Sequence, residues 1–279
     1  MIRYREISYD YPDIFRVYIS GSSSAGKTYF AKQLLNSGIF QFKRIYYFHP
    51  DFHEHDPVNW NETLDKPVFF QAGLPSIKDL LHFEPDSCLV FDDLFEECSC
   101  SKDIDYLFRV LSSKRRLSVI IMTQRYFAQG KFSVSIRNSS NFHVLMNNAD
   151  ARTNMNVANA MKLRPEITRA TEINREKLYP YIFLDKTNRA RVNNLQVYTE
   201  IFNKYREVVI GSMKYYLLTE QDFKSSFTKT GKGSARKTKR KHDSSSESDS
   251  SETSSSESSD SSDAYSKRNR KNKRAIRKY

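Results

Sequence analysis

Eight consecutive residues near the N-terminus have the types and the spacing of a loop that binds phosphate groups. They are Gly21, Ser22, Ser23, Ser24, Ala25, Gly26, Lys27 and Thr28. The segment satisfies the pattern G-x-x-x-x-G-K-[ST] in full, and its small residues let the backbone curl until its N–H groups face an anion. In such a loop, Lys27 reaches the β- and γ-phosphates of a nucleoside triphosphate and the hydroxyl of Thr28 binds Mg²⁺. The pattern predicts binding of ATP together with Mg²⁺.

An acidic pair, Asp92-Asp93, follows the apolar run at residues 88–91. A carboxylate at the end of a strand beside the phosphate loop can hold Mg²⁺ through its water shell, which is the role called Walker B. We assign Asp92 to the metal, and Asp93 to catalysis as the group that orients or deprotonates the attacking water. Without the loop, the same pair would indicate only a turn at the end of a strand.

Gln124 follows the next buried apolar run, residues 118–122, after a single threonine. Ligands of parallel α/β sheets collect at the carboxyl ends of the strands. The amide of Gln124 is therefore a catalytic candidate that senses the γ-phosphate or positions water. The alternative is an ordinary polar residue at a solvent-facing strand end.

The segments around these residues alternate between strand-like and helix-like patterns. Strands are predicted over residues 15–20, 44–48, 67–70, 88–91, 118–122, 142–146, 181–184 and 192–197. Helices are predicted over residues 29–35, 77–83, 104–111 and 150–161. Most of the strands are continuously apolar, as buried parallel strands are. The expected fold class is therefore α/β: a P-loop NTPase with a mainly parallel central sheet that helices flank on both faces.

The composition changes near residue 224, which divides the chain into a predicted ATPase domain (residues 1–224) and a predicted disordered tail (residues 225–279). The tail consists largely of Ser, Lys, Arg, Asp and Glu, and it cannot bury enough apolar surface to offset its ordering entropy. From Lys224 onward, 16 Lys and Arg against 7 Asp and Glu supply +9 of the net charge of +12. The basic character of the chain therefore belongs mainly to the tail.

The tail contains two basic clusters, residues 236–241 and 267–278, on either side of a Ser/Asp/Glu tract at residues 243–263. Such clusters act as nuclear-import signals or contact nucleic-acid phosphates, and the alternative is a tail that only aids solubility. Phosphorylation of the serines would add about −1.5 to −2 charges each and would weaken contact with DNA. Gel shifts with duplex DNA before and after kinase treatment test this expectation.

The cysteines and histidines do not indicate a disulfide framework or a zinc site. Cys88, Cys98 and Cys100 are odd in number, which fits a reducing compartment. His49, His53 and His55 are interpreted as ordinary loop residues, because no cysteine lies near them at ligand spacing. No segment has the pattern of a signal peptide or the ~20 apolar residues of a membrane span, so we expect an intracellular protein without a membrane partner.

The order of these motifs resembles the genome-packaging ATPases of the FtsK–HerA superfamily, in the branch of Polinton/Maverick elements, virophages and large DNA viruses. The likeness covers roughly residues 14–200 and includes Phe127, Arg137-Asn138 and Asp150 in addition to the loop and the acidic pair. It implies an ATP hydrolase coupled to translocation of double-stranded viral DNA into a capsid. It further implies a homo-oligomeric ring, with a hexamer favoured, and capsid proteins as additional partners. The chain departs from the wider superfamily at Asp93, where Glu is common, so the shorter side chain would have to approach the water more closely.

A ring motor commonly completes each site with an arginine from the neighbouring subunit, and such residues supply about 10³–10⁵ in rate. We expect Arg137 in this role, with Arg115 and Arg116 as rivals. The basic clusters of the tail favour the host nucleus, with virion association during assembly as a further location. Two alternatives stay open: another P-loop enzyme, such as a helicase or a nucleotide kinase, and a nucleotide-gated DNA-binding protein without turnover.

Overall fold

The computed structural model describes residues 4–6, 11–51, 60, 62–146, 151–203 and 206–218. The predicted tail with its basic clusters, the boundary near residue 224, and His53, His55 and Asp150 lie outside these residues. Across the described ranges, no helix is long and apolar enough to span a lipid bilayer.

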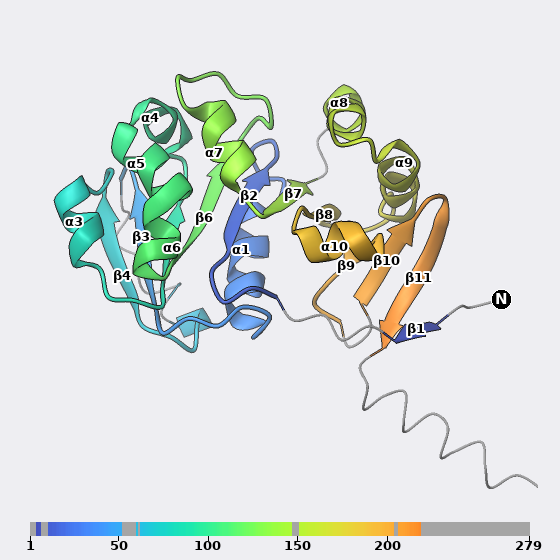
Figure 1. Ribbon diagram of the computed structural model, residues 1–279, viewed down its shortest axis with the longest axis horizontal. Helices are drawn as coiled ribbons and strands as arrows, with labels where there is room; N and C mark the ends of the chain where they lie inside the picture. The colour runs from blue at the N-terminus through green and yellow to red at the C-terminus, as the bar shows by residue number, and fades with distance from the viewer. Residues whose placement is uncertain are drawn as a thin grey trace, which may run out of the picture. The chain divides into compact units, whose positions relative to one another are not determined.

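Within these described ranges, eleven strands form a single sheet (Figure 1). In chain order they are β1 (Tyr4–Glu6), β2 (Arg16–Ser20), β3 (Arg44–His49), β4 (Val68–Ala72), β5 (Ser87–Phe91), β6 (Leu117–Thr123), β7 (Phe142–Met146), β8 (Tyr181–Asp185), β9 (Val197–Glu200), β10 (Arg206–Ile210) and β11 (Met213–Leu218). Across the sheet their order is β1-β11-β10-β9-β8-β7-β2-β6-β5-β3-β4.

The sheet has a parallel half and an antiparallel half. From β7 to β4, each strand runs parallel to its neighbour. From β7 to β11, each runs antiparallel to its neighbour, and β1 adds to β11 in parallel at the edge. The predicted P-loop NTPase fold with a mainly parallel sheet is confirmed, and the parallel half carries the loop. The antiparallel half was not predicted.

Helices cover both faces of the sheet. They are α1 (Lys27–Asn36), α3 (Ile77–His82), α4 (Phe95–Cys100), α5 (Lys102–Tyr106), η1 (Leu107–Leu111), α6 (Ser112–Arg115), α7 (Ser133–Ser139), α8 (Ala151–Met161), α9 (Arg164–Ile173) and α10 (Asn188–Asn193). In Figure 1, α1 lies behind the parallel strands, whereas α4, α5, α6 and α7 lie in front of them.

The strand residues alternate between two cores, as the period of two in a strand requires. Val17 and Ile19 of β2 pack with Phe30 of α1 in the core on one face. Tyr18 points to the other face and joins a core that contains Phe108 of η1. Because both faces of β2 are buried, the strand that leads into the loop is held on both sides.

One predicted element is wrong. Residues 192–197, predicted as a strand, fall in the end of α10, the turn after it and the first residue of β9. The side chain of Thr187 caps α10 by accepting a hydrogen bond from the N–H of Ala190, and Asn194 ends the helix with φ of 56°. These two capping signals outweigh the β-branched Val192.

The helix predicted over residues 104–111 is present but changes type along its length. It begins as the α-helix α5 and continues as η1, a π-helix. A π-helical turn inserts an additional residue relative to an α-helix and often lies near a functional site.

Candidate active site

The predicted phosphate loop joins β2 to α1 at the carboxyl edge of the parallel strands. Gly21, its first residue, donates its backbone N–H to the carbonyl of Thr123 at the end of β6, at 3.0 Å. A Cβ atom on Gly21 would lie 2.6 Å from the Cβ of Met146, so glycine is required for this close approach to β7. Gly26 has φ of 89°, which residues with side chains rarely adopt. The two glycines therefore permit the tight curl that the motif predicts.

Lys27 begins α1 and is only 8% exposed. Its Nζ donates to the loop's own carbonyls, at 3.0 Å from Gly21 O and 3.1 Å from Ser22 O. The first N–H groups of α1 and the positive end of its dipole lie beside this ammonium. A bound phosphate would therefore meet the ammonium, the helix end and the loop N–H groups together.

The two predicted metal ligands lie in contact. The hydroxyl of Thr28 donates to Oδ2 of Asp92 at 3.2 Å, although the two residues follow different strands. Asp92 is 6% exposed, and burial raises the pKa of its carboxyl above the ordinary value. A hydrogen bond from Tyr47 partly offsets this rise, and the nearby charge of Asp93 adds to it. The structure thus assembles Lys27, Thr28 and Asp92 around the loop.

Tyr47 belongs to the site, although no motif in the sequence marks it. Its hydroxyl donates to Oδ2 of Asp92 at 2.6 Å, from the strand β3 that lies next to β5. The sequence signal that could have indicated Tyr47 is its place in the predicted strand at residues 44–48, which lies beside the strand that Asp92 follows. Tyr47 orients the carboxylate and reduces the cost of burying it.

A magnesium ion fits the residues at this position. A threonine hydroxyl and a carboxylate are hard oxygen ligands of the kind that Mg²⁺ prefers. Thr28 would bind the ion directly and Asp92 would hold it through water, as the motif predicts. When bound, Mg²⁺ neutralises negative charge on the β- and γ-phosphates.

The predicted catalytic residues Asp93 and Gln124 lie at the same edge of the sheet, and both are exposed. Asp93 follows Asp92 directly and has φ of 52°, a left-handed conformation that is uncommon for a residue with a side chain. Gln124 follows Thr123, whose carbonyl holds the start of the loop. Their predicted roles toward water and the γ-phosphate stay predictions.

Arg137 does not join Lys27 and Asp92 in its own chain. Its helix, α7, packs on the sheet face opposite α1, where Ile136 joins the second core. The guanidinium of Arg137 donates to the carbonyl of Tyr126 at 3.1 Å and stacks over the ring of Phe127 at 5.1 Å. A role in the site of a neighbouring chain stays a prediction.

The two rival arginines lie at the amino edge of the sheet, opposite the loop. Arg115 donates to the carbonyl of Leu81 at 2.7 Å. Arg116, directly before β6, forms an ion pair of 2.6 Å with Asp86, directly before β5. Arg137 therefore differs from its rivals in position, because it lies on α7 and contacts Tyr126, which follows the carboxyl end of β6.

A buried polar chain that the sequence analysis did not predict lies under Arg137. Lys186 Nζ lies 3.1 Å from Nε2 of His143, whose Nδ1 lies 2.6 Å from the hydroxyl of Tyr126. Burial, followed by the positive charge of Lys186, holds the pKa of His143 well below its ordinary value. Since the ammonium of Lys186 can only donate, the neutral imidazole carries its proton on Nδ1 and donates to Tyr126.

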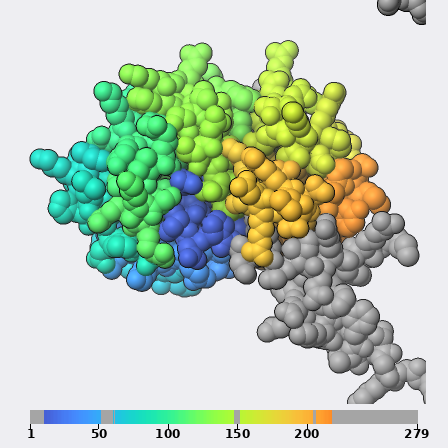
Figure 2. Space-filling view, in the orientation of Figure 1, coloured from blue at the N-terminus to red at the C-terminus, as the bar shows by residue number. Residues whose placement is uncertain are grey.

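A hollow of about 380 Å³ opens beside this chain, between η1, the end of α7 and α10. Its lining residues are Arg16, Phe108, Arg109, Asn138, Ser139, Ser140, Asn141, Lys186 and Arg191. Figure 2 shows this face of the molecule, with α10 in gold beside α7 in light green. Burial and the charges of Arg191 and Arg137 lower the pKa of Lys186 to about 8. We call this feature the basic hollow.

Solved structures with a similar fold include packaging proteins. The genome packaging NTPase B204 from Sulfolobus turreted icosahedral virus 2, in complex with ATP-gammaS, has 12% identity and a TM-score of 0.46, over 67% of this chain and 96% of that chain. The DNA-packaging ATPase B204 from Sulfolobus Turreted Icosahedral Virus has 13% identity and a TM-score of 0.43, over 67% of this chain and 97% of that chain. The flagellar accessory protein FlaH from Methanocaldococcus jannaschii has 11% identity and a TM-score of 0.34, over 48% and 71%.

At these identities the similarity concerns the fold. The sequence matches no protein-family model and no curated protein.

Proposed function

We propose that this chain is an ATP hydrolase that uses ATP and Mg²⁺ to move double-stranded DNA into a capsid. The observation that carries the proposal is the 3.2 Å contact between Thr28 and Asp92 beside the curled loop. Phosphoryl transfer depends mainly on positioning and on neutralising charge, and this contact gathers the groups that do both.

In the proposed reaction, Lys27 leaves the carbonyls of Gly21 and Ser22 and binds the β- and γ-phosphates. Asp93 orients or deprotonates the attacking water, and Gln124 senses the γ-phosphate. Both side chains are exposed at the loop edge of the sheet, which leaves them accessible to water.

The resemblance of the sequence motifs to genome-packaging ATPases is the reason for proposing DNA as the substrate and a ring as the oligomeric state. The basic hollow supports a polyanionic partner, because Arg16, Lys186 and Arg191 converge on one polar depression. We further propose that copies of the chain form a ring, that capsid proteins bind it, and that it acts in the host nucleus. The last point depends on the basic clusters of the tail.

Steady-state ATP hydrolysis by the purified chain, with and without duplex DNA, tests the proposed function. We expect DNA to stimulate hydrolysis, and we expect Lys27→Ala to remove hydrolysis with and without DNA. Hydrolysis that DNA does not change, combined with phosphate transfer to a nucleoside monophosphate, would indicate a kinase instead. Strand separation would indicate a helicase, and ATP binding without hydrolysis would indicate a nucleotide-gated DNA-binding protein.

A prediction about pH follows from the basic hollow. Affinity for duplex DNA should fall between about pH 7 and about pH 9, because Lys186 loses its charge near pH 8 and then no longer attracts a phosphate. Lys186→Arg should remove this part of the pH dependence, since the guanidinium stays charged. Lys186→Ala should reduce the slope of log affinity against log salt by about 1.

Binding titrations at several pH values and salt concentrations measure both effects. Lys43→Ala is the matched control, because Lys43 is a 70% exposed lysine that pairs with Asp86 and does not line the basic hollow. An unchanged pH dependence in Lys186→Arg would exclude the basic hollow from DNA binding.

A further inference from the structure

Two half-exposed aromatic rings lie at the mouth of the phosphate loop. Tyr29 directly follows Thr28 on the first turn of α1, and Tyr179 lies in the turn between α9 and β8. Their ring centroids are 5.4 Å apart at an interplanar angle of 41°, and the residues are 52% and 45% exposed. A Cβ atom on Gly26 would lie 2.8 Å from Cδ1 of Tyr179, so this ring lies directly against the loop.

The order of the strands gives the bound nucleotide a direction. Asp92 follows β5 and Gln124 follows β6, and both strands lie on one side of β2. On the other side lie β7 and β8, where Met146 pairs with Tyr181, so β8 begins at the same edge at which β7 ends. If the γ-phosphate and the metal lie toward Asp92, the nucleoside must extend toward the side of β7 and β8.

Tyr29 and Tyr179 lie on that nucleoside side. The loop and the start of α1 hold the α- and β-phosphates, and the ribose and base continue past them. Tyr29 is the next residue after the metal-binding Thr28 along α1. Tyr179 lies two residues before Tyr181, the first residue of β8.

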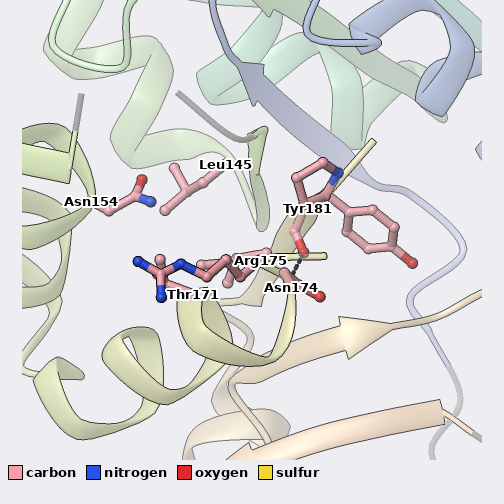
Figure 3. Close-up of a pocket in the computed structure, with 8 residues that line it drawn as sticks. Leu145, Asn154, Thr171, Asn174, Arg175 and Tyr181 are labelled. Carbon is pink, nitrogen blue, oxygen red and sulfur yellow. Dashed lines mark hydrogen bonds between the residues drawn. The ribbon is translucent and has the colours of Figure 1, made fainter. Parts of the chain in front are cut away.

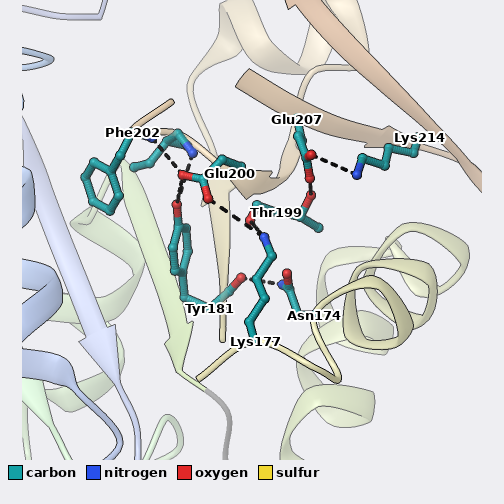
Figure 4. A network of polar contacts seen from close by, with 9 residues as sticks. Asn174, Lys177, Tyr181, Thr199, Glu200, Phe202, Glu207 and Lys214 are labelled. Carbon is teal, nitrogen blue, oxygen red and sulfur yellow. Dashed lines mark hydrogen bonds and ion pairs between the residues drawn. The ribbon is translucent and has the colours of Figure 1, made fainter. Parts of the chain in front are cut away.

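Hydrogen bonds fix the turn that carries Tyr179. At its start, Nδ2 of Asn174 donates to the carbonyl of Tyr181 at 2.6 Å (Figure 3). Within it, Nζ of Lys177 donates to the carbonyl of Thr199 at 2.8 Å. After it, the hydroxyl of Tyr181 donates to Oε1 of Glu200 at 3.0 Å, and Figure 4 shows these contacts together.

The turn is thus tied to β9 from two positions, one on each side of Tyr179. Lys177 Nζ also lies 3.8 Å from Oε2 of Glu200, which adds an ion pair to the network. A ring on such an anchored turn loses little freedom when a ligand stacks on it, which favours binding.

We propose that Tyr29 and Tyr179 form the subsite that stacks the base of the bound nucleotide. This inference rests on the proposed function, because it takes the loop as the site of the triphosphate. Every base can stack on an aromatic ring, but the stacking strengthens with the area of the base. The subsite therefore binds purine nucleotides more tightly than pyrimidine nucleotides. Removal of one ring should weaken nucleotide binding on the order of tenfold to a hundredfold.

Binding titrations of the full chain with ATP, CTP and inorganic tripolyphosphate test the subsite. Tyr179→Ala and Tyr29→Ala should weaken ATP binding by the factor stated above, should leave tripolyphosphate binding unchanged, and should reduce the preference for ATP over CTP. Tyr179→Phe should bind ATP as the wild type does. Tyr106→Ala is the matched control, because Tyr106 is a 38% exposed tyrosine on α5, on the opposite sheet face from α1.

Two results would overturn the subsite while leaving the loop's role intact. Unchanged ATP affinity in both alanine variants would place the base elsewhere. Equal loss of ATP and tripolyphosphate would mean that Tyr179 only shapes the loop. Failure of the wild type to bind tripolyphosphate, or binding that Lys27→Ala does not reduce, would instead refute the loop as the phosphate site and the subsite with it.

Discussion

Asp92→Asn is expected to lower ATP hydrolysis by on the order of 10²–10³-fold, the scale of loss when a charge-stabilising group is removed from an active site. The same change should raise the thermal stability of the protein without nucleotide and Mg²⁺. Burial raises the pKa of Asp92, which means that its ionised form is less favourable in the fold than in the unfolded chain. Asparagine carries no charge, yet it keeps an oxygen to accept from Thr28 and Tyr47.

The two effects of Asp92→Asn are measured separately, by steady-state hydrolysis and by thermal unfolding in the absence of ligands. The gain in stability should be present above the pKa of Asp92 and should vanish in acid, where the wild-type carboxyl is also neutral. Asp13→Asn, at an exposed acid outside the site, should change neither quantity. An inactive variant that is less stable than the wild type would show that lost activity reflects local unfolding rather than a lost metal ligand.

Arg137→Ala is expected to lower hydrolysis by about 10³–10⁵-fold while ATP binding survives. A loss of this size is expected when an arginine of one chain stabilises charge on the transferred phosphoryl group in the site of the neighbouring chain. The geometry is compatible with that role, since Arg137 is partly exposed on α7 and contacts Tyr126 rather than its own phosphate loop. Hydrolysis rates and nucleotide titrations on the same preparation separate the two effects.

Mixing Arg137→Ala with Lys27→Ala distinguishes a contribution in trans from a local one. In a mixed ring, some sites would combine an intact loop from one chain with an intact Arg137 from the next, and activity should partly return. Arg115→Ala, at the edge of the sheet opposite the loop, should hydrolyse ATP without being mixed with another variant. Mixed samples as inactive as the separate variants would exclude the trans role.

The parts of the fold that depend on local patterns were predictable from the sequence. Apolar runs and loop residues predicted three elements: a strand before Gly21, a helix that follows the loop, and a buried strand before Asp92. The structure contains all three. The assignment of Thr28 and Asp92 to one metal site required them to lie close together, and they do, because carboxyl ends of parallel strands meet at one edge.

The parts that depend on contacts distant in sequence were not predictable. The antiparallel half of the sheet follows from pairings such as β7 with β8, which no periodicity specifies. The hairpin between β10 and β11 is an exception, because Gly211 at its tight turn, with φ of 59°, is a short-range signal. Tyr47 and His143 gained their partners only through tertiary packing.

The position of the Lys27 ammonium bears on what happens between one catalytic cycle and the next. The carbonyls of Gly21 and Ser22 accept hydrogen bonds from this cation. The loop itself therefore satisfies this buried charge. We therefore expect nucleotide binding to replace these two hydrogen bonds with bonds from the same ammonium to phosphate oxygens.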